Sequence, residues 1–224
     1  IMSELPEDFY VFLSELESNN NKEWFDLNRK RYENNVKKPF ENFVSNCIQS
    51  IQKIDDKIQI SASHAIFRIN KDIRFSKDKT PYKTNRSALI SPYGTKDKVF
   101  PGLYFEVTAQ KFSIYSGAYM LDTKQIQRVR EDIVDFSDDF NAIINEKQFI
   151  KYFGEIKGDK NVRVSNEFKD LVADQPLLLN KNFYVFAQYK NEVLKTKNLV
   201  ELITNHYKVA QPLNNFLARA IIGD

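Results

Sequence analysis

The sequence predicts an α+β fold, in which an antiparallel sheet of about four strands in the middle of the chain packs against N-terminal and C-terminal helices. Apolar residues recur at helical spacing from about residue 5 to residue 55. The spacing changes to two residues at Phe67, and it returns to a helical period after Asp122. Because helices and strands then occupy separate runs of the chain, the pattern is typical of the α+β class.

Three helices are predicted in the N-terminal part. The first follows Pro6, because proline is favoured in the first turn of a helix. The second runs from about Asn21 to Val36, with Asn20 as its cap and Glu23 reaching back to the cap. The third opens at Pro39 and has the clearest apolar stripe of the chain, which is formed by Phe40, Phe43, Val44, Cys47, Ile48, Ile51 and Ile54.

The strand-rich middle covers about residues 66–118. A first strand is predicted from Phe67 to Phe75, although Lys71 breaks its alternation. Its two sides carry Phe67, Ile69, Ile73 and Phe75, and Arg68, Asn70, Asp72 and Arg74, respectively. A strand in "RSALIS" and a hairpin from Leu103 to Tyr115 complete the predicted sheet, with one face on helices and one face carrying polar groups.

The C-terminal part, about residues 122–222, is predicted to be helical. Asp122 and Gln125 form a capping-box pattern at its start. Shorter helices are expected around Phe140–Ile144 and Gln148–Phe153, followed by irregular chain and one strand in "FYVFAQY". A last helix is expected from Glu192 onward, broken near Pro212. One globular domain over residues 2–224 accounts for the length.

Composition places the chain among ordinary globular proteins, with 42% hydrophobic and 28% charged residues. No apolar run approaches the length of about 20 residues that crosses a bilayer, and the first residues lack the order of a secretory signal. We therefore expect a cytoplasmic protein without a membrane partner. The single cysteine, Cys47, is expected to pack in the core.

Positive charge is concentrated in "FRINKDIRFSKDKTPYKTNR", residues 67–86. The stretch holds seven cations and two acids, a net +5, whereas the whole chain carries +3 and the remainder therefore −2. On the predicted strand, Asp72 would hold Arg68 and Arg74 so that their remaining donors point outward. We expect an anion site there, and its residues would be Arg68, Asp72, Arg74, Lys77, Asp78, Lys79, Tyr82 and Lys83.

A small phosphate-bearing ligand suits this mixture, because arginine forms planar forks and lysine acts as a point charge. The alternative for the same residues is a structural salt-bridge network. Nucleic-acid binding is a further alternative, supported by a second basic cluster of Arg29, Lys30, Arg31, Lys37 and Lys38. A module that docks an acidic protein remains open as well. A pocket would favour the small anion, and an exposed loop would favour a macromolecular partner.

An enzyme is the remaining class. Glu106 on the polar sheet face is the most plausible base, with Tyr115 and Tyr119 stabilising developing charge. Its simpler interpretation is a cross-strand salt-bridge partner. His64 and His206 have no metal-ligand spacing around them, and no Gly-rich phosphate loop occurs, so neither a metal nor a cofactor is expected.

Three segments carry a family resemblance. "NNNKEWFDLNRKRYE", "RFSKDKTPYK" and "SGAYMLDTKQIQRVREDI" resemble, in this order, a widespread family of bacterial and fungal proteins classed as domain of unknown function 2461. The resemblance implies a mixed α and β fold and draws attention to the central decapeptide, and it implies no activity. Beyond Phe153 the chain departs from the family, which often shows a Pro-Lys-Gly-Phe segment and a His-Pro pair where this chain has "RVSNEF" and "ADQP".

Overall fold

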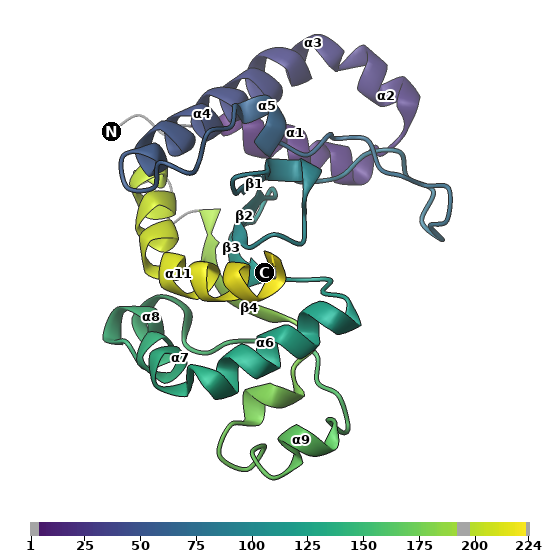
Figure 1. The fold of residues 1–224 in the computed structure, drawn as a ribbon. Coiled ribbons are helices and arrows are strands. Elements are labelled where there is room, and N and C mark those ends of the chain that lie inside the picture. The colour runs from purple at the N-terminus through teal and green to yellow at the C-terminus, as the bar shows by residue number, and fades with distance from the viewer. Residues whose placement is uncertain (1–4, 192–197, 223–224) are drawn as a thin grey trace. The chain divides into compact units, whose positions relative to one another are not determined.

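The computed structural model describes residues 5–191 and 198–222 (Figure 1). It contains one antiparallel sheet with the strand order β1-β2-β3-β4, preceded and followed by helices. The predicted α+β fold is therefore confirmed. The strands are β1 (Arg86–Ile90), β2 (Gly102–Val107), β3 (Lys111–Ala118) and β4 (Phe183–Lys190).

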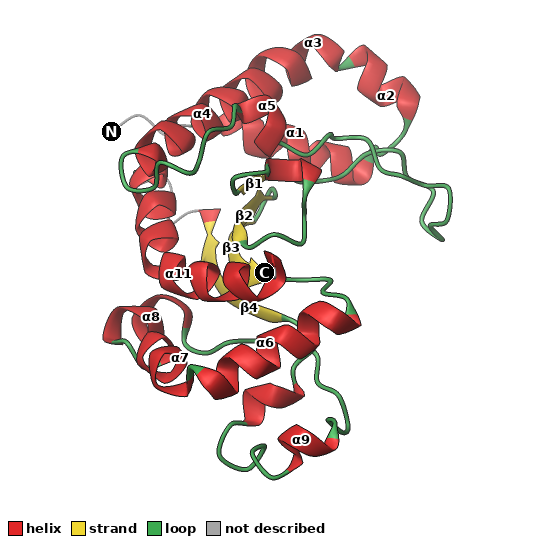
Figure 2. Ribbon diagram, in the orientation of Figure 1, coloured by secondary structure: helices red, strands yellow, loops and turns green. Residues whose placement is uncertain are grey.

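Helices make up most of the remaining regular structure (Figure 2). The helices before the sheet are α1 (Glu7–Ser18), α2 (Lys22–Leu27), α3 (Arg29–Tyr32), the π-helix η1 (Glu33–Lys37), α4 (Lys38–Gln52) and α5 (Ala62–Ala65). The later ones are η2 (Gly94–Lys96), α6 (Thr123–Asp135), α7 (Ser137–Ile144), α8 (Lys147–Phe153), α9 (Asn166–Lys169), η3 (Pro176–Leu179) and α11 (Leu199–Ile222).

The chain divides into two compact units. Unit 1 comprises residues 1–96, 104–114 and 188–205, and unit 2 comprises residues 97–103, 115–187 and 206–224. The single domain expected over residues 2–224 stays a prediction. No helix among the described residues is long and apolar enough to span a membrane.

An aromatic core holds unit 1 together. The apolar stripe of α4 packs on the apolar side of the hairpin, with ring centroids of Phe43 and Phe105 at 5.6 Å and those of Phe105 and Phe112 at 5.8 Å. Phe40 also stacks on Phe9 of α1. Cys47 is fully buried in the same stripe, as predicted. These contacts fix α1, α4 and the hairpin as one base.

The predicted second helix is present but interrupted. Asn28 separates α2 from α3, and the chain then continues through η1 into α4 without a break. The cap of α2 is Asn21, whose side chain accepts a hydrogen bond from the Trp24 amide at 2.9 Å, and not Asn20 as predicted. The side chain of Asn20 is engaged elsewhere, as described below.

Unit 2 has its own apolar core, in which α6, α7 and α11 contribute Val129, Ile133, Phe140 and Leu213. The predicted capping box is present at Asp122, whose side chain accepts a hydrogen bond from the Gln125 backbone amide at 2.8 Å.

The last helix contains Pro212 in its interior, so the predicted break there is wrong. The buried neighbours Leu213 and Leu217 keep the helix packed although proline removes one backbone hydrogen bond. The predicted start at Glu192 lies outside the described residues.

Candidate functional site

The basic motif lies on a loop-like arm, residues 67–85, which precedes β1 in unit 1. It projects beside α1 and α2 and is drawn entirely as loop (Figures 1 and 2). The predicted strand from Phe67 to Phe75 is therefore wrong. The segment instead forms isolated antiparallel bridges: Asn70 pairs with Tyr82 within the arm, and Ile66 pairs with Ala88 at its base.

The two legs of the arm, residues 67–71 and 81–85, are nevertheless held in register by backbone hydrogen bonds. The Lys83 amide donates to the Ile69 carbonyl at 2.8 Å, and the Lys71 amide donates to the Pro81 carbonyl at 2.9 Å. Pairing stops there because Pro81 has no amide hydrogen to return. Residues 72–80 beyond this point form the tip of the arm.

The tip is closed by a staple of three side chains. The Lys71 ammonium binds Asp78 at 2.7 Å and the Thr80 hydroxyl at 2.6 Å, and Asp78 accepts the Thr80 amide at 2.9 Å. These donors, Lys71 first, lower the pKa of Asp78. Because the folded-state pKa is depressed, the staple survives as the pH falls through the ordinary carboxyl range and is lost only in stronger acid.

Asp72 and Arg74 form a second local pair. Arg74 donates through Nε at 3.0 Å and through Nη2 at 2.7 Å, and this bidentate contact lowers the pKa of Asp72. Arg68 makes no hydrogen bond with Asp72 or with any other described side chain. The expected clamp of two arginines on one acid is thus formed by Arg74 alone.

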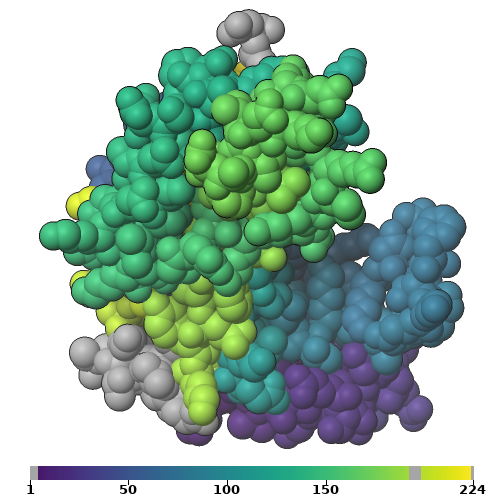
Figure 3. Space-filling model, turned by 90° about the horizontal axis from the view of Figure 1, so that it is seen from below, coloured from purple at the N-terminus to yellow at the C-terminus, as the bar shows by residue number. Residues whose placement is uncertain are grey.

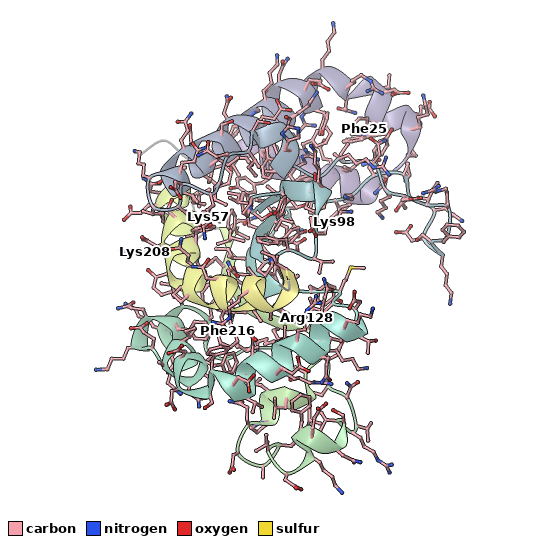
Figure 4. The ribbon with its side chains drawn as sticks, in the orientation of Figure 1. Phe25, Lys57, Lys98, Arg128, Lys208 and Phe216 are labelled. Carbon is pink, nitrogen blue, oxygen red and sulfur yellow. The ribbon has the colours of Figure 1, made fainter. Side chains whose placement is uncertain are left out.

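Asn20 and Phe25 anchor the arm to the N-terminal helices. The Asn20 side chain donates to the Tyr82 carbonyl at 2.9 Å and accepts from the Tyr82 amide at 3.1 Å. The Tyr82 ring stacks on Phe25 with a centroid distance of 4.0 Å and an interplanar angle of 17°. Phe25 itself is labelled on α2 in Figure 4. Tyr82 is 5% exposed, so its ring belongs to this anchor.

In contrast, the tip is open to solvent. Phe75 is 96% exposed, and the side chain of Arg74 is 76% exposed. Lys77 and Lys79 are exposed as well, and the Lys79 ammonium donates to the Ile73 carbonyl at 3.0 Å. The space-filling view shows this segment, in blue, standing out beside the purple N-terminal helices (Figure 3).

Arg86 differs from the other cations of the motif because it is 4% exposed on β1. Its guanidinium donates to the Phe67 carbonyl at 3.1 Å and lies 5.4 Å from the Phe40 ring centroid. Burial lowers its pKa. Arg86 therefore supports the base of the arm.

Charge on the arm is only partly neutralised. Its six cations and two acids give a net +4, and the two acids are taken by Lys71 and Arg74. Arg68, Lys77 and Lys79 pair with neither acid of the arm, and the Lys83 ammonium lies 5.4 Å from the Phe67 ring centroid. The arm is therefore a local source of positive potential.

Three of the five cations in the second basic cluster pair with acids. Arg31 bridges to Asp8 and Glu15, at 2.5 Å each. Arg29 pairs with Asp26, and Lys37 pairs with Glu33 at 3.1 Å. These contacts fasten α1, α2, α3 and η1, whereas Lys38 binds the neutral Asn34 side chain at 3.2 Å.

Glu106 is half-buried at the base of the arm in unit 1. One carboxylate oxygen, Oε2, accepts from the Asn85 amide group at 2.9 Å and from the Tyr104 hydroxyl at 2.9 Å. Tyr115 and Tyr119 belong to unit 2, where the ring centroid of Tyr115 is 4.7 Å from that of Phe186 and Tyr119 packs edge-on against Tyr184. Glu106 is thus held by neutral donors, and a catalytic role for these three residues stays a prediction.

Both histidines lie in ordinary surroundings. His64 is exposed beside the Ser61 hydroxyl, and His206 is buried against the rings of Tyr152 and Phe153. Within residues 5–191 and 198–222, no group of three or more His, Cys, Asp or Glu side chains could hold a metal ion.

Sequence reasoning missed four residues that shape the arm: Asn20, Phe25, Lys71 and Thr80. The break that Lys71 makes in the alternation was the one available signal, because its side chain turns toward the acid of the tip. Nothing in "NNNK" distinguishes the asparagine that caps a helix from the one that binds a distant backbone.

No curated protein and no solved structure matches the chain significantly. One family model does match, over residues 8–216, and it includes the arm, the hairpin and most of α11. It is described as "Conserved hypothetical protein (DUF2461)". The match spans nearly the whole chain, and the protein therefore belongs to the DUF2461 family of conserved hypothetical proteins.

Proposed function

We propose that this protein is a binding module whose basic arm docks onto an anionic macromolecule. The observation that carries the proposal is the exposure of the tip, where Phe75 is 96% exposed and the Arg74 side chain is 76% exposed. Cations that recognise a small ligand usually converge on a concave site. On this arm they lie on a projecting loop instead, which suits a larger surface.

Charge and rigidity support the same proposal. The net charge of +4 on the arm attracts a polyanion from a distance, and this attraction weakens as salt rises. The staple at Lys71 and the anchor at Asn20 hold the arm in one shape before binding. Less conformational entropy is then lost on association.

A charge-reversal experiment tests the proposal. Lys77→Glu with Lys79→Glu should weaken binding to a labelled oligonucleotide or to polyglutamate, whichever the wild type binds, by about tenfold or more at low salt. The matched control is Lys96→Glu with Lys111→Glu, which changes the net charge equally at exposed positions of unit 1. The control should bind like the wild type, and equal losses in both variants would refute the arm as the binding surface.

The small-ligand function makes a different prediction in a thermal-shift panel of phosphate, nucleotides and sugar phosphates. A small anion bound at the arm would raise the melting temperature by mass action. Stabilisation that disappears in the Lys77 and Lys79 variant, without binding of any polyanion, would replace the macromolecular proposal with the small-ligand one.

A further inference from the structure

Phe75 has no structural reason to stand at the tip of the arm. It is the most exposed large apolar side chain among the described residues, and the sequence pattern places it on the buried side of a strand. The Arg74 guanidinium lies over the Phe75 ring, 6.0 Å from its centroid. A ring displayed in this way is available to a partner.

The surroundings of Phe75 show what kind of partner fits. Arg74 is fixed beside the ring by its bidentate contact with Asp72, while Lys77 follows two residues later and Lys79 four residues later. The tip therefore offers one aromatic face flanked by cations on a short length of chain. Single-stranded nucleic acids are bound by this combination, in which bases stack on aromatic rings and cations follow the phosphates.

We infer that the macromolecule bound by the arm is a single-stranded nucleic acid, and that Phe75 stacks on one of its bases. The inference rests on the proposed function and specifies its partner. A single strand is favoured over a duplex because its bases present free faces, whereas a duplex must first be unstacked. The ion pairs of Arg29, Arg31 and Lys37 also withdraw three cations of the second basic cluster from a duplex backbone.

The ring beside the cations favours a nucleic acid over an acidic protein. Arginine forks match phosphate as well as carboxylate, and lysine serves either anion as a point charge. Bases, in contrast, stack on an exposed ring such as that of Phe75, while Lys77 and Lys79 follow the phosphates. One phenylalanine also provides too little apolar area for a lipid surface, which needs a whole helix face or a lipid anchor.

The test uses the full chain and two labelled probes, an oligothymidylate of about 12 nucleotides and an abasic deoxyribose-phosphate oligomer of the same length. The wild type should bind the oligothymidylate more tightly than the abasic oligomer. Phe75→Ala should lose about fivefold or more in affinity for the oligothymidylate alone, and Phe75→Trp should retain it. The control Leu27→Ala, which removes an apolar side chain that is 81% exposed in the same unit, should change neither affinity.

Failure of this inference is distinguishable from failure of the proposed function. Equal binding of both oligomers, no effect of Phe75→Ala, tighter binding of a duplex, or binding of polyglutamate alone would each overturn single-strand recognition. In each of these cases, if charge reversal at Lys77 and Lys79 still abolishes binding of the polyanion that the wild type binds, the arm remains a polyanion-binding surface. Absence of binding to every polyanion at low salt overturns both.

Discussion

Arg86 shows how one residue of a basic motif can serve the fold instead of the ligand. Its guanidinium is buried against Phe40, and it reaches the Phe67 carbonyl where the arm leaves the base. Nε has no hydrogen-bond partner among the described residues, and burial lowers the pKa of the group. A buried cation without a carboxylate is costly, so its contacts must offset part of that cost.

We expect Arg86→Ala to lower the free energy of unfolding by about 2 kcal/mol, because the Phe67 carbonyl loses its donor and the side-chain packing is lost. Urea denaturation measures this change. Arg68→Ala, at an exposed position of the arm, should change stability by less than about 0.5 kcal/mol. An Arg86→Ala protein of unchanged stability that no longer binds polyanions would instead place Arg86 in the binding surface.

Asn20 is the second residue whose role is structural. Both of its hydrogen bonds go to the backbone of Tyr82, across a sequence separation of 62 residues. Removing them should free the second leg of the arm while leaving α1 and α4 packed.

Asn20→Ala should therefore speed tryptic cleavage at Lys77 and Lys79 and speed hydrogen exchange at the Lys83 amide, with only about 1 kcal/mol lost in overall stability. Asn21→Ala removes the cap of α2 at similar cost and is the matched control. Equal acceleration in both variants would mean that the arm follows general stability and that Asn20 is not its specific anchor.

At the level of elements, periodicity located the longer helices, the hairpin, β1 and β4, because each buries a regular stripe of apolar residues. It missed the short helices α5, η2, α9 and η3, which are too short to show such a stripe. It failed at the arm for a physical reason. Pro81 cannot donate to the opposite leg, and Lys71 turns toward Asp78, so the pairing ends before Ile73 and Phe75 reach any apolar surface.

The sequence predicts which charged residues belong to the candidate site, but it does not predict the projecting conformation of the arm that carries them. The concentration of cations follows from the sequence, and the structure places six of the seven on the arm. The projection of the tip depends on contacts with Asn20 and Phe25, more than 50 residues away, which no local pattern reveals. For the same reason Tyr82 proved to be an anchor ring.

On the scale of the whole molecule, the open question is whether the two compact units unfold together. Trp24 and Cys47 lie in unit 1 and can report on its unfolding. Unit 2 can be perturbed separately at a buried hydrogen bond of 2.9 Å between the Asn214 side chain and the Ser116 hydroxyl. If residues 2–224 form one domain, a change in either unit must alter the unfolding of both.

Asn214→Ala should thus lower the free energy of unfolding by about 1–2 kcal/mol, because the Ser116 hydroxyl loses a buried partner. In a single domain, the urea transition followed by Trp24 fluorescence should shift together with that followed by circular dichroism, and Cys47 should become labelled sooner. A Trp24 transition that stays in place while circular dichroism shows two steps would establish independent units.

The central claim is that the cations of the arm make the anion-binding surface, and the salt dependence of affinity tests it most directly. Each phosphate contact to a single strand contributes about −0.7 to the slope of log affinity against log salt. In a titration with labelled oligothymidylate, Lys77→Glu with Lys79→Glu should make this slope shallower by about 1.4, whereas Lys96→Glu with Lys111→Glu should leave it unchanged. An unchanged slope in the arm variant, or the same change in the control, would contradict the account.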